Sequence, residues 1–417
     1  MRLSKQGLFV QLHRSCQLAI ICLSLALTGC FGGSSSGSSG SESQSISGGG
    51  IKGPLVDAIV TVYDLDTTAE DFKGAAAGSP GTTDEQARIT GLALPFPITP
   101  PYIMEFSSDE TTTDIYTGEA PVISEMRTVI TQSLLDSGEQ IYATPLTTMA
   151  VDLAIKNADV ATAPWDVRDL DTDDDGIDDL SVDLGNSAVS VDEFLSALPI
   201  AAAQVKSTLG FGIRQDIDIF DTPPLIDDTM DTEAEQEDAA AYRAAVEAVT
   251  AVVDQIDNAT GKGDANAVLS ALTNDLADGE IDGEVDGETS ELFDGESDTA
   301  DASLQLLEQD PATLPIPNDP LGRTVGEMKD IIDAEKEDLG NAAVTTAIDT
   351  EEEVVLKPAE VNPDIDGDGV SNEHDAFPTD GNEFIDSDGD GEGDKADTDR
   401  DGDGTDNAQD AFPLNAN

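Results

Sequence analysis

The chain has 417 residues, which is enough for two or three domains. Its 87 acidic and 19 basic residues give a formal net charge of −68 at pH 7, which argues against nucleic acid as a partner, because phosphates are bound by Lys and Arg. Aromatic residues make up 4% of the chain, so we expect a modest, aliphatic core. The charge opposes compaction unless cations screen it, and bound divalent cations would supply that neutralisation locally.

The first 29 residues are typical of an export signal. They begin with the basic residues Arg2, Lys5 and Arg14. An apolar run over residues 18–27 follows, and it is too short to span a membrane as a mature helix. The run ends in Leu27-Thr28-Gly29-Cys30, which resembles the lipobox of bacterial lipoproteins. The alternatives are an ordinary signal peptide and a signal anchor.

The lipobox resemblance implies that Cys30 becomes the lipidated first residue after cleavage. By resemblance to sorted lipoproteins, Phe31 in place of Asp after this cysteine implies a lipid-anchored protein of the outer membrane. It would face either the periplasm or the outside. Cys16 and Cys22 would leave with the signal, so no intramolecular disulfide is expected.

Residues 30–50 are rich in Gly and Ser. This composition predicts a flexible tether with a root-mean-square span of about 20–25 Å. We expect the tether to hold the folded part clear of the lipid surface.

Residues 51–118 carry the pattern of a small β domain. β-branched content and Gly, Pro and Asp punctuation predict strands over residues 58–63, 88–94 and 102–106. The run from Gly53 to Tyr63, together with Thr83-Asp84 and Gly91, resembles the carboxypeptidase-regulatory-like, prealbumin-type β-sandwich. In that family the module is structural or adhesive and carries no catalytic residues. The alternative is an unrelated small β domain.

Residues 119–345 change to a helical period, and we expect a loose helical bundle. One apolar stripe is predicted to end at Gly138 and consists of Met126, Val129, Ile130 and Leu134. Helix starts are indicated by Thr144-Pro145 and by capping boxes at Ser190/Glu193, Thr232/Glu235 and Thr324/Glu327. The clearest helix covers residues 233–257, and a further one carries Val268, Leu269, Leu272 and Leu276.

Two acidic inserts interrupt the helical region. The first is a candidate calcium loop that lacks a carboxylate at Val182 and offers Asp171, Asp173, Asp175 and Asp179. The alternative is a solvated acidic loop. The second insert repeats Asp-Gly-Glu between residues 278 and 296, and we interpret it as a low-complexity linker. Residues 346–363 contain two prolines and are predicted to form a hinge.

The tail, residues 364–417, repeats a hard-cation pattern of alternate carboxylates followed by glycine. Ca²⁺ takes six to eight oxygen ligands, and a chain that turns around the ion offers them from fixed positions. The first copy offers Asp364, Asp366, Asp368, Asn372 and Asp375. The second copy offers Asp386, Asp388, Asp390, Asp394 and Asp397. The third copy offers Asp399, Asp401, Asp403, Asn407 and Asp410.

The tail differs from an EF-hand, because position 12 is Asp and no apolar helices flank it. It resembles thrombospondin type-3 repeats, in which calcium ions and successive aspartates build a wire-like module. The absence of cysteine and the motifs Ala376-Phe377-Pro378 and Ala411-Phe412-Pro413 are similar to a bacterial variant. The alternative is a disordered acidic tail.

No catalytic constellation is found in the sequence. The histidines are His13, in the predicted signal, and His374, in the first tail copy, which leaves little for His-based acid–base work or a zinc site. Phosphate-loop and nucleophile-elbow motifs are absent. We therefore expect a protein that is not an enzyme.

The fold class predicted is multidomain: a small all-β sandwich, then a mainly α-helical domain, then an irregular calcium-bound Asp-rich tail. The function expected is a calcium-binding, lipid-anchored envelope protein with an adhesion or scaffold role and a surface protein or glycan as candidate partner. The alternative is a ligand- or polysaccharide-binding lipoprotein of an uptake or secretion system, for which Trp165 would be either a ligand platform or a core anchor.

Overall fold

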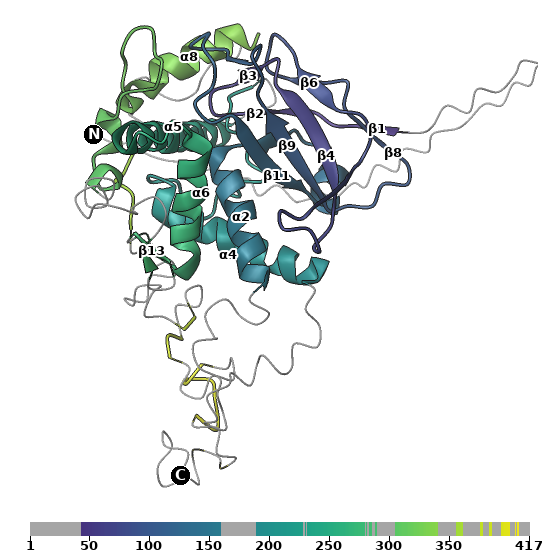
Figure 1. The fold of residues 1–417 in the computed structure, drawn as a ribbon, viewed down its shortest axis with the longest axis vertical. Coiled ribbons are helices and arrows are strands. Elements are labelled where there is room, and N and C mark those ends of the chain that lie inside the picture. The colour runs from purple at the N-terminus through teal and green to yellow at the C-terminus, as the bar shows by residue number, and fades with distance from the viewer. Residues whose placement is uncertain are drawn as a thin grey trace, which may run out of the picture. The chain divides into compact units, whose positions relative to one another are not determined.

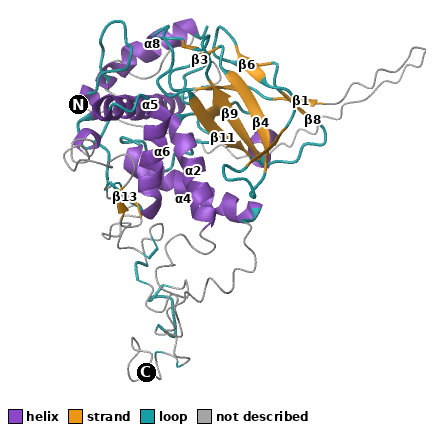
Figure 2. Ribbon diagram, in the orientation of Figure 1, coloured by secondary structure: helices purple, strands orange, loops and turns teal. Residues whose placement is uncertain are grey.

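The computed structural model has a β-rich N-terminal region followed by helices (Figures 1 and 2), which confirms the predicted order of these two regions. The residues that it describes are 43–159, 189–227, 230, 232–279, 281, 283–285, 288–289, 305–340, 356–361, 376–377, 383–385, 393–400, 405 and 407.

The main sheet has six antiparallel strands in the order β11-β9-β4-β6-β7, with β5 paired to β4. Its strands are β4 (Ile59–Leu65), β5 (Lys73–Ala76), β6 (Gly81–Thr83), β7 (Ile89–Thr90), β9 (Tyr102–Ser107) and β11 (Glu125–Ile130). In the central pair, Val60 lies opposite Phe106 and Val62 opposite Met104, and all four side chains are buried. The predicted strands at 58–63 and 102–106 are confirmed.

Smaller sheets continue the β-rich region beyond residue 118. The antiparallel pairs are β1 (Ser43–Ser45) with β8 (Ala93–Pro95), and β3 (Leu55–Val56) with β10 (Thr113–Asp114). A parallel pair joins β2 (Gly48–Gly50) to β12 (Ile141–Ala143). The predicted strand over residues 88–94 is divided between β7 and β8.

The predicted tether is wrong over residues 43–50, since β1 and β2 belong to the folded body. The glycines of β2 are buried; Gly48 and Gly49 lie against other backbone, and Gly50 lies against a side chain. A Cβ on Gly48 would overlap the carbonyl group of Ile141, and one on Gly50 would lie 2.8 Å from the ring of Phe106. Glycine is required here for close packing, whereas composition alone indicated flexibility.

Gly48→Ala is expected to lower the free energy of unfolding by about 3 kcal/mol or more. The added Cβ would overlap Ile141, and the φ of Gly48, +139°, is one that side chains rarely adopt. Gly91→Ala is the matched control. Gly91 has a φ of +72° but nothing within 4 Å of an added Cβ, so we expect a loss of about 1–2 kcal/mol. Urea denaturation of both variants measures the difference, and equal losses would contradict the packing argument.

The helical stripe predicted over residues 126–134 is wrong in its first part. Residues 125–130 form strand β11, which pairs with β9 in register from Glu125↔Ser107 to Ile130↔Tyr102. Only the short helix α1 (Gln132–Ser137) follows, and it ends at Gly138 with φ 71°, as predicted. Long-range pairing overrides the local period here, because Met126, Thr128 and Ile130 also alternate as in a strand.

The remaining predicted helix starts are confirmed. The helices are α2 (Pro145–Asp159), α4 (Val191–Leu209), α5 (Glu233–Thr260), α6 (Ala265–Asp275) and α8 (Met328–Asp338). Capping boxes are formed at Ser190/Glu193, Thr232/Glu235 and Thr324/Glu327. Short 3₁₀ turns occur at Leu276–Asp278, Pro311–Thr313 and Val325–Glu327.

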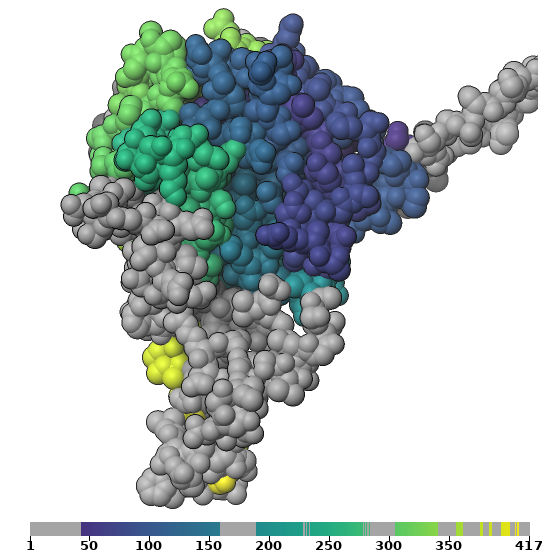
Figure 3. Space-filling model, viewed as in Figure 1, coloured from purple at the N-terminus to yellow at the C-terminus, as the bar shows by residue number. Residues whose placement is uncertain are grey.

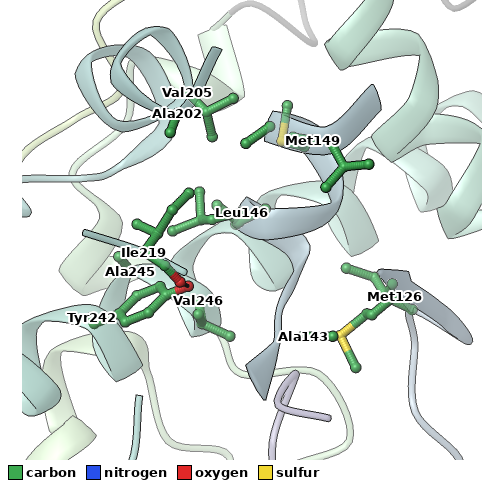
Figure 4. Packing of buried hydrophobic residues seen from close by; sticks show 14 of the residues in the cluster. Met126, Ala143, Leu146, Met149, Ala202, Val205, Ile219, Tyr242, Ala245 and Val246 are labelled. Carbon is green, nitrogen blue, oxygen red and sulfur yellow. Dashed lines mark hydrogen bonds between the residues drawn. The ribbon is translucent and has the colours of Figure 1, made fainter. Parts of the chain in front are cut away.

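Strands and helices share one hydrophobic core. Strand residues such as Met126 and Ala143 belong to the same cluster as Leu146, Val205 and Val246 from three helices (Figure 4). Phe72, in the β-rich region, meets Phe194 of α4 edge to face at a centroid distance of 5.4 Å. In the space-filling view, blue atoms of the first half of the chain abut green atoms of the later helices (Figure 3). The helices therefore pack on the sheets as well as on one another.

A buried charge network ties the same elements together. Lys52 Nζ lies 2.9 Å from Asp114 Oδ2, and Arg243 donates to Glu335 at 2.6 and 3.0 Å and to Glu247 at 2.9 Å. These side chains are 2–3% exposed. The residues come from the turn after β2, from β10, from α5 and from α8. Sequence patterns gave no signal for the Lys52–Asp114 and Arg243–Glu335 pairs, since these partners are distant along the chain.

Burial and neighbouring charges together shift pKa values in this network of three carboxylates and two cations. Burial lowers the pKa of Lys52, but Asp114 and Glu247 outweigh it and raise the pKa above its ordinary value. Burial raises the pKa of Glu335, even though Arg243 opposes the rise. Within the described residues, Glu247 Oε1 is buried without a hydrogen-bond partner. The network is therefore sensitive to the loss of either cation.

Two segments predicted as linkers are partly packed. Ile281 of the Asp-Gly-Glu insert is buried and donates its N–H to the Val361 carbonyl group at 2.8 Å. Strands β13 (Glu284–Val285) and β14 (Glu288–Thr289) then pair as a hairpin, and the sequence between them is Asp-Gly, a preferred hairpin turn.

The predicted hinge also contains an ordered segment, residues 356–361. Lys357 and Glu360 donate their N–H groups to the carbonyls of Phe211 (2.8 Å) and Thr208 (3.0 Å) at the end of α4. Ala359 donates to Leu307 at 3.1 Å and is buried. This part of the hinge is fixed to the helical body.

Candidate functional site

The described part of the tail centres on the junction between the second and third copies of the aspartate pattern. We call Asp394, Asp397, Asp399 and Asn407 the tail junction. Asp397 Oδ1 accepts the N–H of Asp399 at 2.7 Å. Asn407 Nδ2 donates to the Asp397 carbonyl oxygen at 3.0 Å, and the N–H of Asn407 donates to the Thr398 carbonyl oxygen at 2.7 Å. The ninth position of the third copy therefore lies against Asp397 and Thr398, just before the first position of that copy.

Neighbouring backbone contacts fix the shape of the tail junction. Asp394 donates its N–H to the Ile385 carbonyl oxygen at 2.9 Å, and Asp397 donates to that of Gly393 at 2.9 Å. A Cβ at Gly393 would lie 2.6 Å from the carboxyl group of Glu383, so any larger residue there would have to displace that side chain. Asn407 Oδ1 accepts the N–H of Arg400 at 3.2 Å, which closes the turn.

The other predicted site residues lie outside the described residues. They are Cys30; Asp171, Asp173, Asp175 and Asp179; Asp364, Asp366, Asp368, Asn372 and Asp375; Asp386, Asp388 and Asp390; and Asp401, Asp403 and Asp410. His374 and Trp165 also lie there.

The donor chemistry of the tail junction fits calcium, since its side chains offer carboxylate and amide oxygens. Among the residues that the structure describes, no group of three or more His, Cys, Asp or Glu side chains is arranged to hold a metal ion. The described residues of the tail junction are therefore not by themselves a complete ligand set for calcium. The remaining positions of the third copy are Asp401, Asp403 and Asp410.

Two grooves on the helical body are a second candidate, which the sequence did not predict. One has a volume of about 420 Å³ and lies between α1, α4 and residues 215–221. The other has a volume of about 480 Å³ and is lined by residues 138–140, 221–223, Met230, Glu235 and Asp238. Asp221 lines both.

The grooves have an acidic rim and one buried cation. Lys206 Nζ, in the first groove, donates to the carbonyl oxygens of Gln215 and Ile217 at 2.6 Å each. Burial lowers the pKa of Lys206, although Asp218 and Asp216 oppose the shift. At the second groove, the charge of Asp221 raises the pKa of Glu139, and partial burial and a hydrogen bond between the two add to the rise.

Asp221→Asn is expected to bring the pKa of Glu139 down towards 4.5, because it removes the neighbouring charge. Nuclear magnetic resonance titration of the Glu139 carboxyl carbon measures this shift. Asp216→Asn, at the rim of the other groove, is the control and should leave the pKa of Glu139 unchanged. An unchanged pKa in Asp221→Asn would contradict direct coupling of the two carboxylates.

Comparison of the chain with protein-family models, with curated proteins and with solved structures found no match. Within the described ranges, no helix is long and apolar enough to cross a membrane.

Proposed function

We propose that this chain is a non-enzymatic, lipid-anchored, calcium-binding protein of the cell envelope with an adhesion or scaffold role. The observation that carries the proposal is the tail junction. There the last ligand position of one copy, Asp397, lies beside the first and ninth positions of the next copy, Asp399 and Asn407. Such closure supports a loop that wraps a cation rather than an extended acidic tail.

The charge of the tail explains why it would depend on a cation. Carboxylates at alternate positions repel one another when they converge. Bound Ca²⁺ would supply the positive charge that lets these oxygens gather, and extracellular calcium modules work near ~10⁻⁴–10⁻³ M. The Asn407 hydrogen bonds hold two proposed ligand positions, Asp397 and Asn407, together through the main chain. Less conformational entropy is then lost when the loop becomes ordered around a cation.

The β-rich region is proposed to be the carboxypeptidase-regulatory-like, prealbumin-type module. Support comes from the antiparallel sheet built on β4 and β9. The run of residues 53–63, which carries the resemblance, includes most of β4. Thr83 lies in β6, and its Oγ1 accepts the N–H of Ala58 at 2.9 Å. Gly91 forms the turn after β7 with a φ of +72°. A structural or adhesive role is what the resemblance implies for such a module.

Three measurements test the proposal. Palmitate labelling of cells that express the chain should mark the wild type but not Cys30→Ser. Titration calorimetry of the purified full chain should show heat on calcium addition, and an absence of heat up to several millimolar calcium would overturn the calcium assignment. Protease treatment of intact cells, followed by detection of the tail, distinguishes an outward from a periplasmic orientation.

The grooves favour ligand binding as a second function. Their volumes, about 420 and 480 Å³, lie within the range of small-molecule sites. A glycan or ligand array on the full chain tests this function, with a bulky substitution such as Ala202→Phe in the first groove as the blocking variant. Binding that survives this substitution would exclude the first groove.

A further inference from the structure

Because residues 43–50 contain strands, the folded body begins closer to Cys30 along the sequence than the predicted tether implied. Only residues 31–42 separate this cysteine from β1. A Gly/Ser-rich chain of that length has a root-mean-square span of about 17–21 Å. The surface around β1 is therefore the part of the described body that lies nearest to the proposed lipid along the chain.

β1 begins beside an exposed apolar loop, which follows its partner strand β8. In the register of β1 with β8, Ser43 lies opposite Pro95, and Phe96 is the next residue. We call residues 95–101 the Phe96 loop. Phe96 is 54% exposed, and Pro95 and Pro97 beside it are exposed as well. The first strand that the structure describes thus begins next to a solvent-facing aromatic ring.

The Phe96 loop is held in place from within. Ile98 packs against the hydrophobic core, and the Tyr102 hydroxyl accepts the N–H of Thr99 at 2.6 Å. The side chain of Tyr102 is buried in the main sheet. An anchored loop presents Phe96 outward at little further entropic cost.

The loop is also uncharged in a chain with a net charge of −68. No Asp, Glu, Lys or Arg occurs over residues 89–104. Carboxylates are repelled by the negative surface potential of anionic lipid, whereas an uncharged Phe/Pro/Ile loop is not. Burying the ring among lipid chains removes apolar surface from water.

We propose that the Phe96 loop is a membrane-contact surface that inserts Phe96 into the lipid interface beside the anchor. This rests on the proposed lipidation of Cys30. The loop would set the orientation of the body, with β1 and β8 towards the lipid, so that the tether and the ring are two contacts with one surface.

A fluorescence experiment on the lipidated full chain tests the contact. Trp165→Phe removes the single native tryptophan, and Phe96→Trp then places the only indole in the loop. In vesicles of phosphatidylcholine and phosphatidylglycerol with brominated acyl chains, we expect a blue shift and strong quenching of this tryptophan. Leu321→Trp in the same background is the control, because Leu321 is 74% exposed and lies far along the chain from the tether. Absent quenching in Phe96→Trp, or equal quenching in both variants, would overturn the proposal.

Palmitate labelling separates failure of the anchor from failure of the loop. If Cys30 carries no lipid, the proposed anchoring fails, and the loop is then tested by sedimenting the same full chain with vesicles. Phe96→Ser should weaken this association about tenfold, a free-energy difference of about 1.4 kcal/mol. Its melting temperature should stay unchanged, because Phe96 is exposed. Unchanged association would overturn the loop proposal whether or not the anchor exists.

Discussion

Arg243→Met is expected to lower the free energy of unfolding by about 3–5 kcal/mol, a large part of the stability of a typical domain. Arg243 is the common partner of Glu335 and Glu247, and all three side chains are about 2% exposed. Without the guanidinium group, two carboxylates lose their hydrogen bonds inside the body and cannot regain water. Denaturation in guanidinium chloride, followed by circular dichroism, measures the loss.

Two further variants show whether the loss comes from unpaired charge. Arg243→Met combined with Glu335→Leu should recover part of the stability, because it removes the carboxylate with the closest contact to Arg243. Arg214→Met is the exposed control. Arg214 pairs with Asp216 and Asp238 at the surface, so its loss should leave the denaturation midpoint nearly unchanged. A double variant less stable than Arg243→Met would contradict the argument.

Local patterns predicted the parts of the fold that depend on local chemistry. The capping boxes at Ser190 and Thr232 form as expected, because the cap and its Glu partner are three residues apart. Strand β4 was evident from its β-branched residues. The helix end predicted at Gly138 has the left-handed backbone that glycine favours.

Features that depend on distant contacts were missed. Gly48 and Gly50 have the composition of a linker, and only the close approach of Ile141 and Phe106 shows why glycine is there. Residues 126–130 fit a helical stripe until the pairing with β9 is known. The Lys52–Asp114 pair spans 62 residues of sequence, so no spacing rule could indicate it.

In the tail, too, local sequence patterns indicated the candidate residues but not the contacts between distant residues. Alternate carboxylates predicted which residues would serve as ligands, but the backbone bonds that close the junction on Asn407 carry no recognisable pattern. The fixing of residues 356–361 against α4 was likewise unexpected. It limits the freedom of the chain just before the first aspartate copy, so ordering of the tail would begin from a fixed base.

Calcium is expected to protect the tail from trypsin at Lys395 and Arg400, the only Lys and Arg residues over positions 362–417. Lys395 and Arg400 lie between residues of the tail junction along the chain, and the junction must open before a protease can cleave there. We take a dissociation constant of about 1 mM, as for an extracellular module. At a calcium concentration ten times this value, linkage predicts about tenfold slower cleavage than in EDTA. Mass spectrometry of the released C-terminal peptides measures both rates.

Asp399→Asn should abolish most of this protection, because it removes the first carboxylate of the third copy and its charge. Asp380→Asn is the matched control, since it removes one tail carboxylate that lies outside the repeated pattern. If calcium acted only by screening the charge of −68, both variants would behave alike and magnesium at the same concentration would protect equally. A loss confined to Asp399→Asn, with weaker protection by magnesium, would instead require oxygens placed for a cation larger than Mg²⁺, because Mg²⁺ demands near-ideal octahedral geometry and keeps its waters.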